Sequence, residues 1–363
     1  MGRTDIQKRK RSEEHGGRAA KLPAQERKQH LYPGAGLGLG PPGPWVRHCL
    51  YLLLDDWEAG YSVRKLDVND FNPAASNTNL PPPKRFTEQP VVSRVEAPHV
   101  RPWNFVSHGS KIFAMKANNA SPAIPAFDTA TLSTTICPWP SCRADYVIPL
   151  FASISGKLFL FLEDRSEYLG DPPTHDSKKQ APWSWTTINS QLPFYNMQVA
   201  CYALHPDGRT FFVSAGSSRH DDCPGTFSFD AERLEWTYHG DWLLPFDGQA
   251  YFDAELEAWV GFARGKDNAG YLCSCDVPPV AAELTSPPSW KLGMDKMFHK
   301  ESELHRGAKL VYMGDSKFCL VESLFHKGDQ HLCRDDPTKV DLDDNLYPPQ
   351  RRRVLHMTTF GLK

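Results

Sequence analysis

A short motif, a tight turn followed by an apolar strand, recurs along most of the chain at intervals of about fifty residues. Gly109, Gly156 and Gly208 mark the turn in three copies, at spacings of 47 and 52 residues. A further copy spans 312–320, and a degenerate copy without the glycine spans 253–260. A glycine turn between apolar runs is typical of a β-hairpin, because glycine accepts the positive φ that such a turn needs. The spacing therefore predicts a repeated, hairpin-based unit.

A second motif, Phe-Asp-x-x-x-Leu, follows downstream of the first. It is clear at Phe127–Leu132 and Phe229–Leu234, and weaker copies lie at Leu66–Val68 and Cys275–Val277. An aromatic strand such as Glu235–Tyr238 comes after it. We expect the Asp side chain to cap a turn that leads from a strand in the middle of a sheet to an outer strand.

Two hairpins joined in this way make a four-stranded antiparallel sheet, which can cover its faces only by stacking on neighbouring copies. The uninterrupted apolar run Leu158–Leu162 is typical of strands covered on both sides. Residues 45–363 provide about six such units. We therefore predict an all-β fold, a β-propeller of about six four-stranded blades, in which strands from the two chain ends share a blade. The expected units are 45–98, 99–146, 147–196, 197–247, 248–304 and 305–363.

The first 44 residues differ from the rest in charge and composition. Residues 1–30 hold 9 basic and 4 acidic residues, a net charge of +5, whereas the whole chain carries −2. Eight of the eleven residues 34–44 are Gly or Pro, a composition that cannot bury enough side chain to order itself. Residues 1–44 are therefore predicted to be a disordered basic tail and linker. A basic cluster within it is either a nuclear-localisation signal or a solvated tail: Lys8, Arg9, Lys10 and Arg11.

The chain also lacks the marks of secretion and of membrane insertion. No apolar stretch follows the basic N-terminus, and the apolar runs are far shorter than the roughly 18 residues that a membrane helix needs. The near-neutral total charge argues against a nucleic-acid partner. Nine scattered cysteines do not resemble a disulfide framework. We expect an intracellular protein with reduced thiols, in the cytoplasm or the nucleus.

The repeat length, the glycine turn followed by a Lys/Arg-apolar-Phe strand and the Phe-Asp-x-x-x-Leu step together resemble kelch-type β-propellers. More closely, residues 45–363 are similar to a large group of plant kelch-like proteins that is expanded in grasses. The resemblance implies a propeller fold and says little about function.

No catalytic, cofactor-binding or metal-binding residue is predicted from the remaining motifs. Cys273 and Cys275 would face the same side of a strand, where two thiolates can chelate a metal, but two small core residues are the favoured interpretation. The segment 220–223 and the acidic run 335–344 are interpreted as solvated loops. The indoles of Trp183 and Trp185 are expected to pack between blades.

Two hypotheses for function remain open. The first is a non-catalytic platform for an unidentified protein partner, which would bind long connections near 68–98, 163–183, 217–225 and 326–350. The alternative is an enzyme or small-ligand binder that uses the mouth of the propeller's central channel. His108 and His205 lie near turns, but the sequence offers no paired carboxylates to support that chemistry.

Overall fold

The structure is a computed structural model that describes part of the chain. Residues 47–363 form one unit of the chain, and it is considered by itself. In the described ranges, no helix has the length and hydropathy needed to cross a membrane. The described ranges are 49–56, 60–67, 90–96, 104–115, 123–141, 149–170, 172, 183–217, 224–280, 286–325 and 353–362.

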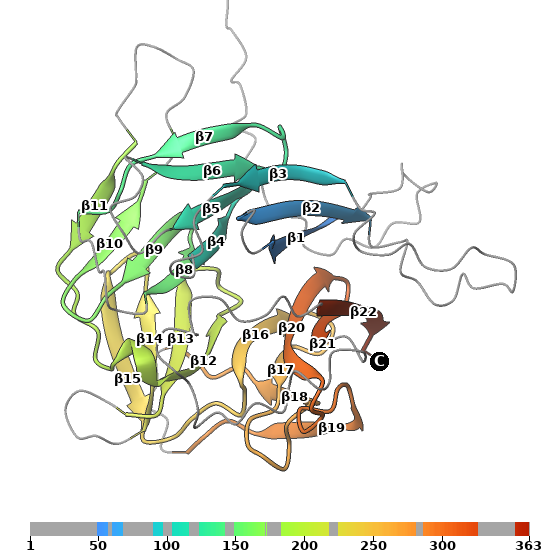
Figure 1. Ribbon diagram of the computed structural model, residues 1–363. Helices are drawn as coiled ribbons and strands as arrows, with labels where there is room; N and C mark the ends of the chain where they lie inside the picture. The colour runs from blue at the N-terminus through green and yellow to red at the C-terminus, as the bar shows by residue number, and fades with distance from the viewer. Residues whose placement is uncertain are drawn as a thin grey trace, which may run out of the picture. The chain divides into compact units, whose positions relative to one another are not determined.

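The strands form antiparallel sheets that follow one another in chain order (Figure 1). The first sheet holds β1 (Cys49–Asp55), β2 (Tyr61–Asp67) and β3 (Val91–Val95). The second holds β4 (Asn104–His108), β5 (Lys111–Met115), β6 (Ile124–Asp128) and β7 (Thr134–Cys137). The third holds β8 (Leu150–Ile154), β9 (Lys157–Phe161), β10 (Ser166–Leu169) and β11 (Trp185–Ile188).

The next sheet has eight strands, in the order β15-β14-β13-β12-β16-β17-β18-β19. One half is β12 (Val199–Leu204), β13 (Thr210–Ala215), β14 (Gly225–Asp230) and β15 (Glu235–Gly240). The other half is β16 (Gly248–Asp253), β17 (Ala258–Phe262), β18 (Tyr271–Asp276) and β19 (Trp290–Lys296). The last sheet holds β20 (His305–Gly314), β21 (Lys317–Phe325) and β22 (Arg353–Gly361).

These strands make six consecutive groups, which we call blades 1 to 6. Blades 4 and 5 are the two halves of the eight-stranded sheet, and they join through parallel pairing of β12 with β16, from Cys201↔Gly248 to Ala203↔Ala250. First strands of successive blades also lie close together elsewhere, as β4 does to β8 and β16 to β20. The arrangement is that of a β-propeller, in which each blade packs on the next. The predicted all-β fold and the number of units are thus confirmed.

The two sequence motifs form the turns that were expected of them. Gly109, Gly156 and Gly208 all have positive φ, between 56° and 72°, in the turns between first and second strands. In the Phe-Asp-x-x-x-Leu motif, Asp128 Oδ1 accepts a hydrogen bond from the backbone N–H of Ala130 (2.9 Å). Asp230 Oδ1 does the same with Glu232 (2.8 Å). Both turns lead from the third strand of a blade to its outer strand.

Apolar clusters fill the spaces between neighbouring blades. One joins blades 2 and 3, one joins 3 and 4, one joins 4 and 5, and one joins 5 and 6. The run Leu158–Leu162 is at most 3% exposed, as its unbroken apolar sequence predicted. Trp183 packs edge-on against Phe113 of blade 2, and Trp185 Nε1 donates to the Pro138 carbonyl (2.8 Å). The prediction of packing between blades is confirmed for both indoles.

One expectation about the chain ends is wrong. The described strands of the two ends form separate three-stranded sheets, because β1 pairs with β2 and β22 pairs with β21. No pairing joins the first sheet to the last among the strands that the structure describes. Two of the segments expected to be recognition loops also contain strands: β3 lies within 68–98, and β10 lies within 163–183. The division of the chain into 1–44 and 45–363 stays a prediction.

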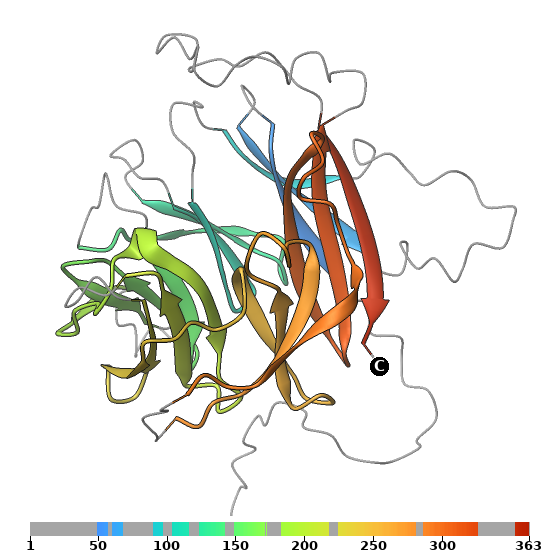
Figure 2. The ribbon, with the colours of Figure 1, turned by 90° about the horizontal axis from the view of Figure 1, so that it is seen from below.

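The antiparallel order gives each blade two distinct ends. The turns between first and second strands and between third and fourth strands share one end, which we call the turn face. The chain passes from one blade to the next at the opposite end, which we call the connection face. Figure 2 shows the strands from another direction, with the long strands of blade 6 running side by side.

Candidate functional site

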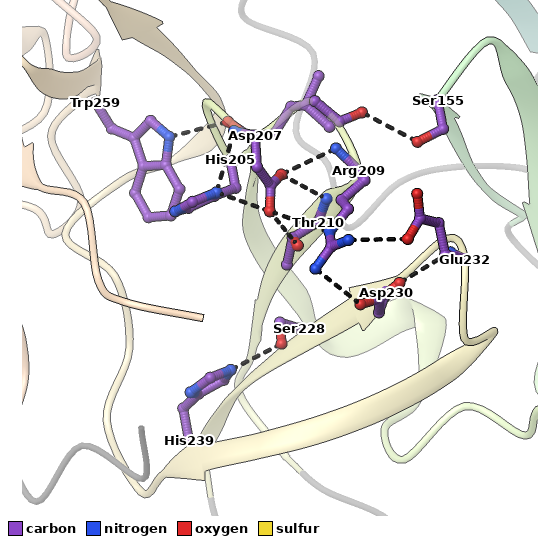
Figure 3. A network of polar contacts seen from close by, with 12 residues as sticks. Ser155, His205, Asp207, Arg209, Thr210, Ser228, Asp230, Glu232, His239 and Trp259 are labelled. Carbon is purple, nitrogen blue, oxygen red and sulfur yellow. Dashed lines mark hydrogen bonds and ion pairs between the residues drawn. The ribbon is translucent and has the colours of Figure 1, made fainter. Parts of the chain in front are cut away.

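The turn face of blade 4 carries a dense network of polar contacts around Asp207 (Figure 3). Asp207 Oδ1 accepts hydrogen bonds from the backbone N–H groups of Arg209 and Thr210, both at 2.9 Å. Its Oδ2 accepts from the Thr210 hydroxyl (2.7 Å) and lies 3.1 Å from His205 Nδ1. Burial alone would raise the pKa of Asp207, but these hydrogen bonds outweigh it and hold the pKa below its ordinary value.

Arg209 joins the two turns of blade 4 at this face. Its Nη1 lies 2.8 Å from Glu232 Oε2, and its Nη2 lies 3.9 Å from Asp230 Oδ2. The Arg209 side chain is 41% exposed, so each ion pair contributes little to stability. Three carboxylates therefore lie within 4 Å of this guanidinium, and Glu232 is hydrogen-bonded to it.

The same network ties blade 4 to the blades on either side. The Gly208 carbonyl accepts a hydrogen bond from the backbone N–H of Ser155 in blade 3 (3.1 Å). On the other side, Trp259 Nε1 of blade 5 donates to the Leu204 carbonyl (3.0 Å). These bonds make the network a structural connection between three blades.

Comparable links occur between other blades at the turn face. His108 Nδ1 and Ser153 Oγ are hydrogen-bonded at 2.8 Å between blades 2 and 3. Ser316 Oγ of blade 6 donates to Asp253 Oδ1 of blade 5 (2.8 Å), and both residues are buried. His108 and His205 are the two histidines singled out in the sequence. His108 therefore helps to link blades 2 and 3, and His205 lies in the polar network at one turn of blade 4.

A serine–histidine pair that sequence reasoning missed lies inside blade 4. His239 Nε2 and Ser228 Oγ are 2.8 Å apart, and the Phe212 ring stacks on the imidazole at 5.0 Å. The pairing register between β14 and β15 shifts at this point and skips His239, which forms a β-bulge. Such a pair resembles part of a hydrolase site, but the two residues are only 2–3% exposed. A buried pair of this kind satisfies the polar groups of the core, and no substrate can reach it.

Three thiols lie in the apolar cluster between blades 4 and 5. Burial raises the pKa of Cys273 and Cys275 to about 12 and that of Cys201 to about 11. Thiols in this state are protonated at neutral pH and are poor metal ligands. Within the described ranges, no three His, Cys, Asp or Glu side chains are grouped to hold a metal ion. The interpretation of Cys273 and Cys275 as small core residues on one strand face is confirmed.

The connection face of blade 4 is different, because it exposes large apolar side chains. The short 3-10 helix Asn196–Gln198 (η5) leads into β12. Tyr195 and Met197 on this segment are 39% and 74% exposed. Tyr238, near the end of β15, is 46% exposed. We call Tyr195, Met197 and Tyr238 the connection-face patch.

Aromatic rings beneath the connection-face patch connect the segment before β12 with β15. Phe194, next to Tyr195, packs against Phe227 with ring centroids 5.3 Å apart, and Phe227 packs against Tyr238 at 5.4 Å. The Gly216 N–H donates to the Gln198 carbonyl (2.7 Å) and fixes the segment on blade 4. The patch therefore stands on a rigid base, which suits binding.

Other sequence predictions lie outside the described residues. These are the basic cluster Lys8, Arg9, Lys10 and Arg11, the segment 220–223 and the acidic run 335–344. No motif marked Tyr195 and Met197 of the patch, because the segment that holds them lies between repeats.

No curated protein matches the chain. Among solved structures, the chain is similar to a protein of unknown function from Bacteroides thetaiotaomicron, with 11% identity and a TM-score of 0.35. That match covers 61% of this chain and only about half (52%) of the other protein. A chain of a nidogen/laminin complex is 12% identical, with a TM-score of 0.38, over 78% of this chain and 91% of that one. The profile of one family, described as "Protein of unknown function (DUF1668)", matches residues 47–363. Since the match takes in every described blade, the chain belongs to the family DUF1668.

Proposed function

We propose that this protein is a non-catalytic β-propeller scaffold that binds a protein partner through the connection-face patch. The observation that carries the proposal is the exposure of Tyr195, Met197 and Tyr238 on a packed aromatic base. Tyrosine and methionine are enriched where proteins meet, because they bury much area and adapt to a partner's shape. The partner surface that fits is apolar, because the Tyr238 hydroxyl already donates to the Asp241 carboxylate.

The kelch-like character of the blades and a plant source belong to this proposal too. They are supported by the repeat spacing, the glycine turns and the Asp-capped turns. An intracellular location, in the cytoplasm or the nucleus, is likewise part of this proposal.

A reporter carrying residues 1–30 tests the basic cluster Lys8, Arg9, Lys10 and Arg11. Nuclear accumulation of the reporter supports a localisation signal, and an even distribution rules that signal out.

Comparative proximity labelling in living cells tests the scaffold function. The wild-type chain, a double variant Met197→Ala/Tyr238→Ser and a control Leu256→Ala are expressed at equal levels. Leu256 is 40% exposed but lies in the turn between β16 and β17, on the turn face. We expect a defined set of partners with the wild type and the control, and at least a tenfold loss of that set with the double variant.

Two outcomes contradict the proposal. Recovery of no partner above background would argue against a scaffold function. Equal recovery with all three chains would place the binding surface elsewhere. Unchanged unfolding midpoints of the variants are required, so that loss of binding reports on the patch and not on the fold. The alternative, chemistry at the channel mouth, has no supporting constellation among the residues described.

A further inference from the structure

The outer strand of blade 5, β19, exposes an unusual set of side chains. Trp290, Leu292 and Met294 are 46%, 41% and 95% exposed, and they stand at alternate positions of the strand, which share a face. In the described ranges, the outer strands of the other blades carry at most one exposed large apolar side chain each. Single residues of this kind are common on protein surfaces, whereas a contiguous group marks an interaction site. We call Trp290, Leu292 and Met294 the outer stripe.

The outer stripe continues the apolar face that blade 5 turns toward blade 4. Trp290 lies opposite Cys275 in the pairing of β19 with β18. Leu292 lies opposite Cys273 in the same way. Residues directly opposite each other share a face of the sheet, and both thiols belong to the apolar cluster between blades 4 and 5. Trp290 and Leu292 are therefore the part of this face that blade 4 leaves uncovered.

Strand β19 also has a backbone edge with no described strand beside it, because it lies at one end of the eight-stranded sheet. Such an edge offers N–H and C=O groups to another chain. The pairing with β18 is regular from Trp290 to Leu292, and its register shifts before Lys296. The regular part of the edge is therefore short, and it fits a short extended segment.

A single cation lies in the middle of this regular part. Lys291 stands between Trp290 and Leu292, so its side chain is on the opposite face of the strand. It is exposed, and it forms no ion pair with any residue that the structure describes. The other charged residues of β19, Asp295 and Lys296, lie beyond Leu292, where the register is no longer regular. An acidic side chain on a neighbouring strand, directly opposite Lys291, would complement this charge.

The size of the outer stripe favours a peptide over a second folded domain as its partner. None of the three side chains is larger than the roughly 250 Å² that an aromatic residue can bury, and two of them are less than half exposed. Together they provide well under the about 800 Å² per partner of a stable interface between folded proteins. An extended peptide needs less side-chain area, because main-chain hydrogen bonds to the strand edge add to its affinity.

We propose that β19 binds an extended segment of a partner protein in which apolar and acidic residues alternate. The segment pairs with the free edge of β19 along Trp290–Leu292. Its apolar side chains cover the outer stripe, and an acidic side chain between them lies opposite Lys291. This site is separate from the connection-face patch, which lies on blade 4.

Fluorescence polarisation with labelled synthetic peptides and the full-length protein tests this proposal. The probe is Ile-Glu-Val-Glu-Ile-Glu-Val, and a second peptide carries Lys in place of every Glu. We expect the wild type to bind the acidic probe at least fivefold more tightly than the basic peptide, and Lys291→Glu to reverse this preference. The double variant Trp290→Ser/Leu292→Ser should bind the acidic probe at least tenfold more weakly, because it removes most of the apolar contact.

A third peptide tests the pairing of main chains. It carries Pro in place of both Val residues, so it keeps its apolar and acidic character but loses two backbone donors. We expect it to bind the wild type at least tenfold more weakly than the probe. The matched control is Lys266→Glu, which makes the same charge change at an exposed residue between β17 and β18 and should leave every preference unchanged.

The variants are compared at equal unfolding midpoints. If the double variant is less stable than the wild type, Met294→Ser replaces it, because a side chain that is 95% exposed adds little to the fold; a threefold loss of binding is then expected. Absence of binding by the acidic probe overturns the proposal. So does a preference that Lys291→Glu leaves unchanged, binding that survives the stripe substitutions, or equal binding of the Pro-containing peptide. None of these results depends on the connection-face patch.

Discussion

Blades 4 and 6 contain similar hairpins but are held in the propeller very differently. Blade 4 has apolar clusters on both faces, and Phe229 and Phe212, on its two faces, are fully buried. Blade 6 shares one such cluster with blade 5, and most side chains of β22 are half-buried or exposed. The comparison teaches that one local pattern can produce a rigid central blade and a weakly enclosed terminal one.

The largest effect is expected from removing a ring in blade 4. Phe229→Ala deletes a fully buried side chain that contacts Phe159, Phe161 and Trp236. We expect a loss of about 3–5 kcal/mol in the free energy of unfolding. Leu355→Ala in β22 should cost only about 1 kcal/mol, because Leu355 is half-buried. Guanidinium titration of both variants measures the difference, and equal losses would contradict the contrast between the blades.

The buried link that holds blade 6 to blade 5 should have the next largest effect. Ser316→Ala removes the hydroxyl that donates to the Asp253 carboxylate, and hydrogen bonds to buried charged groups are worth about 2 kcal/mol. Ser155→Ala is the matched change between blades 3 and 4. It should cost less than about 0.5 kcal/mol, because that link is made mainly by the backbone N–H. Thermal unfolding distinguishes the two, and a larger loss for Ser155→Ala would reverse the proposed order.

A smaller effect should come from the turn of blade 4. Gly208 has φ of +72°, and a Cβ at this position meets no atom within 4 Å. Gly208→Ala should therefore cost about 1 kcal/mol from backbone strain alone. Gly307→Ala in blade 6 has equal space and no positive φ, so its effect should stay within about 0.5 kcal/mol of zero. Similar unfolding midpoints for the two variants would show that the turn conformation does not matter.

The smallest effect extends the comparison to the turn of blade 2 and depends on pH. The Lys111 ammonium, 2.5 Å from Asp128 Oδ2, lowers the pKa of that carboxyl from 3.8 to about 2. Because the folded-state pKa is below the ordinary value, the ionised form stabilises the fold above about pH 4. This contribution is lost as the pH falls toward 2.

Lys111→Met removes the main cause of that shift. The variant should be less stable by about 0.5 kcal/mol at neutral pH. The difference between variant and wild type should shrink as the pH falls from 4 to 2. Unfolding midpoints measured across this range check the expectation, and a difference that does not change with pH would contradict it.

The repeated parts of this fold could be predicted because each unit carries its own signal. Gly109, Gly156 and Gly208 specify hairpin turns through φ, and the Asp of Phe-Asp-x-x-x-Leu caps its turn through a side chain a few residues away. These are local effects, which a sequence displays directly. The alternation of strands and the number of blades follow from them.

The parts that could not be predicted depend on contacts between distant residues. The sequence does not mark which blade a terminal strand joins, so β22 was expected to share a blade with the N-terminal strands and instead pairs with β21. The Ser228–His239 pair depends on a bulge in the register of β15. Tyr195 and Met197 of the connection-face patch lie between repeats, where no periodic signal exists.

The parallel pairing of β12 with β16 has a mechanical consequence. The other neighbouring blades described here belong to separate hydrogen-bonded sheets. Side-chain packing is therefore the main interaction that holds these blades together. Blades 4 and 5 share main-chain hydrogen bonds from Cys201↔Gly248 to Ala203↔Ala250. Under force or partial denaturation, this pair should therefore open as a single piece while blades elsewhere come apart one at a time. Inserting or deleting one blade should therefore disturb the fold less at any other described junction than at the junction between blades 4 and 5.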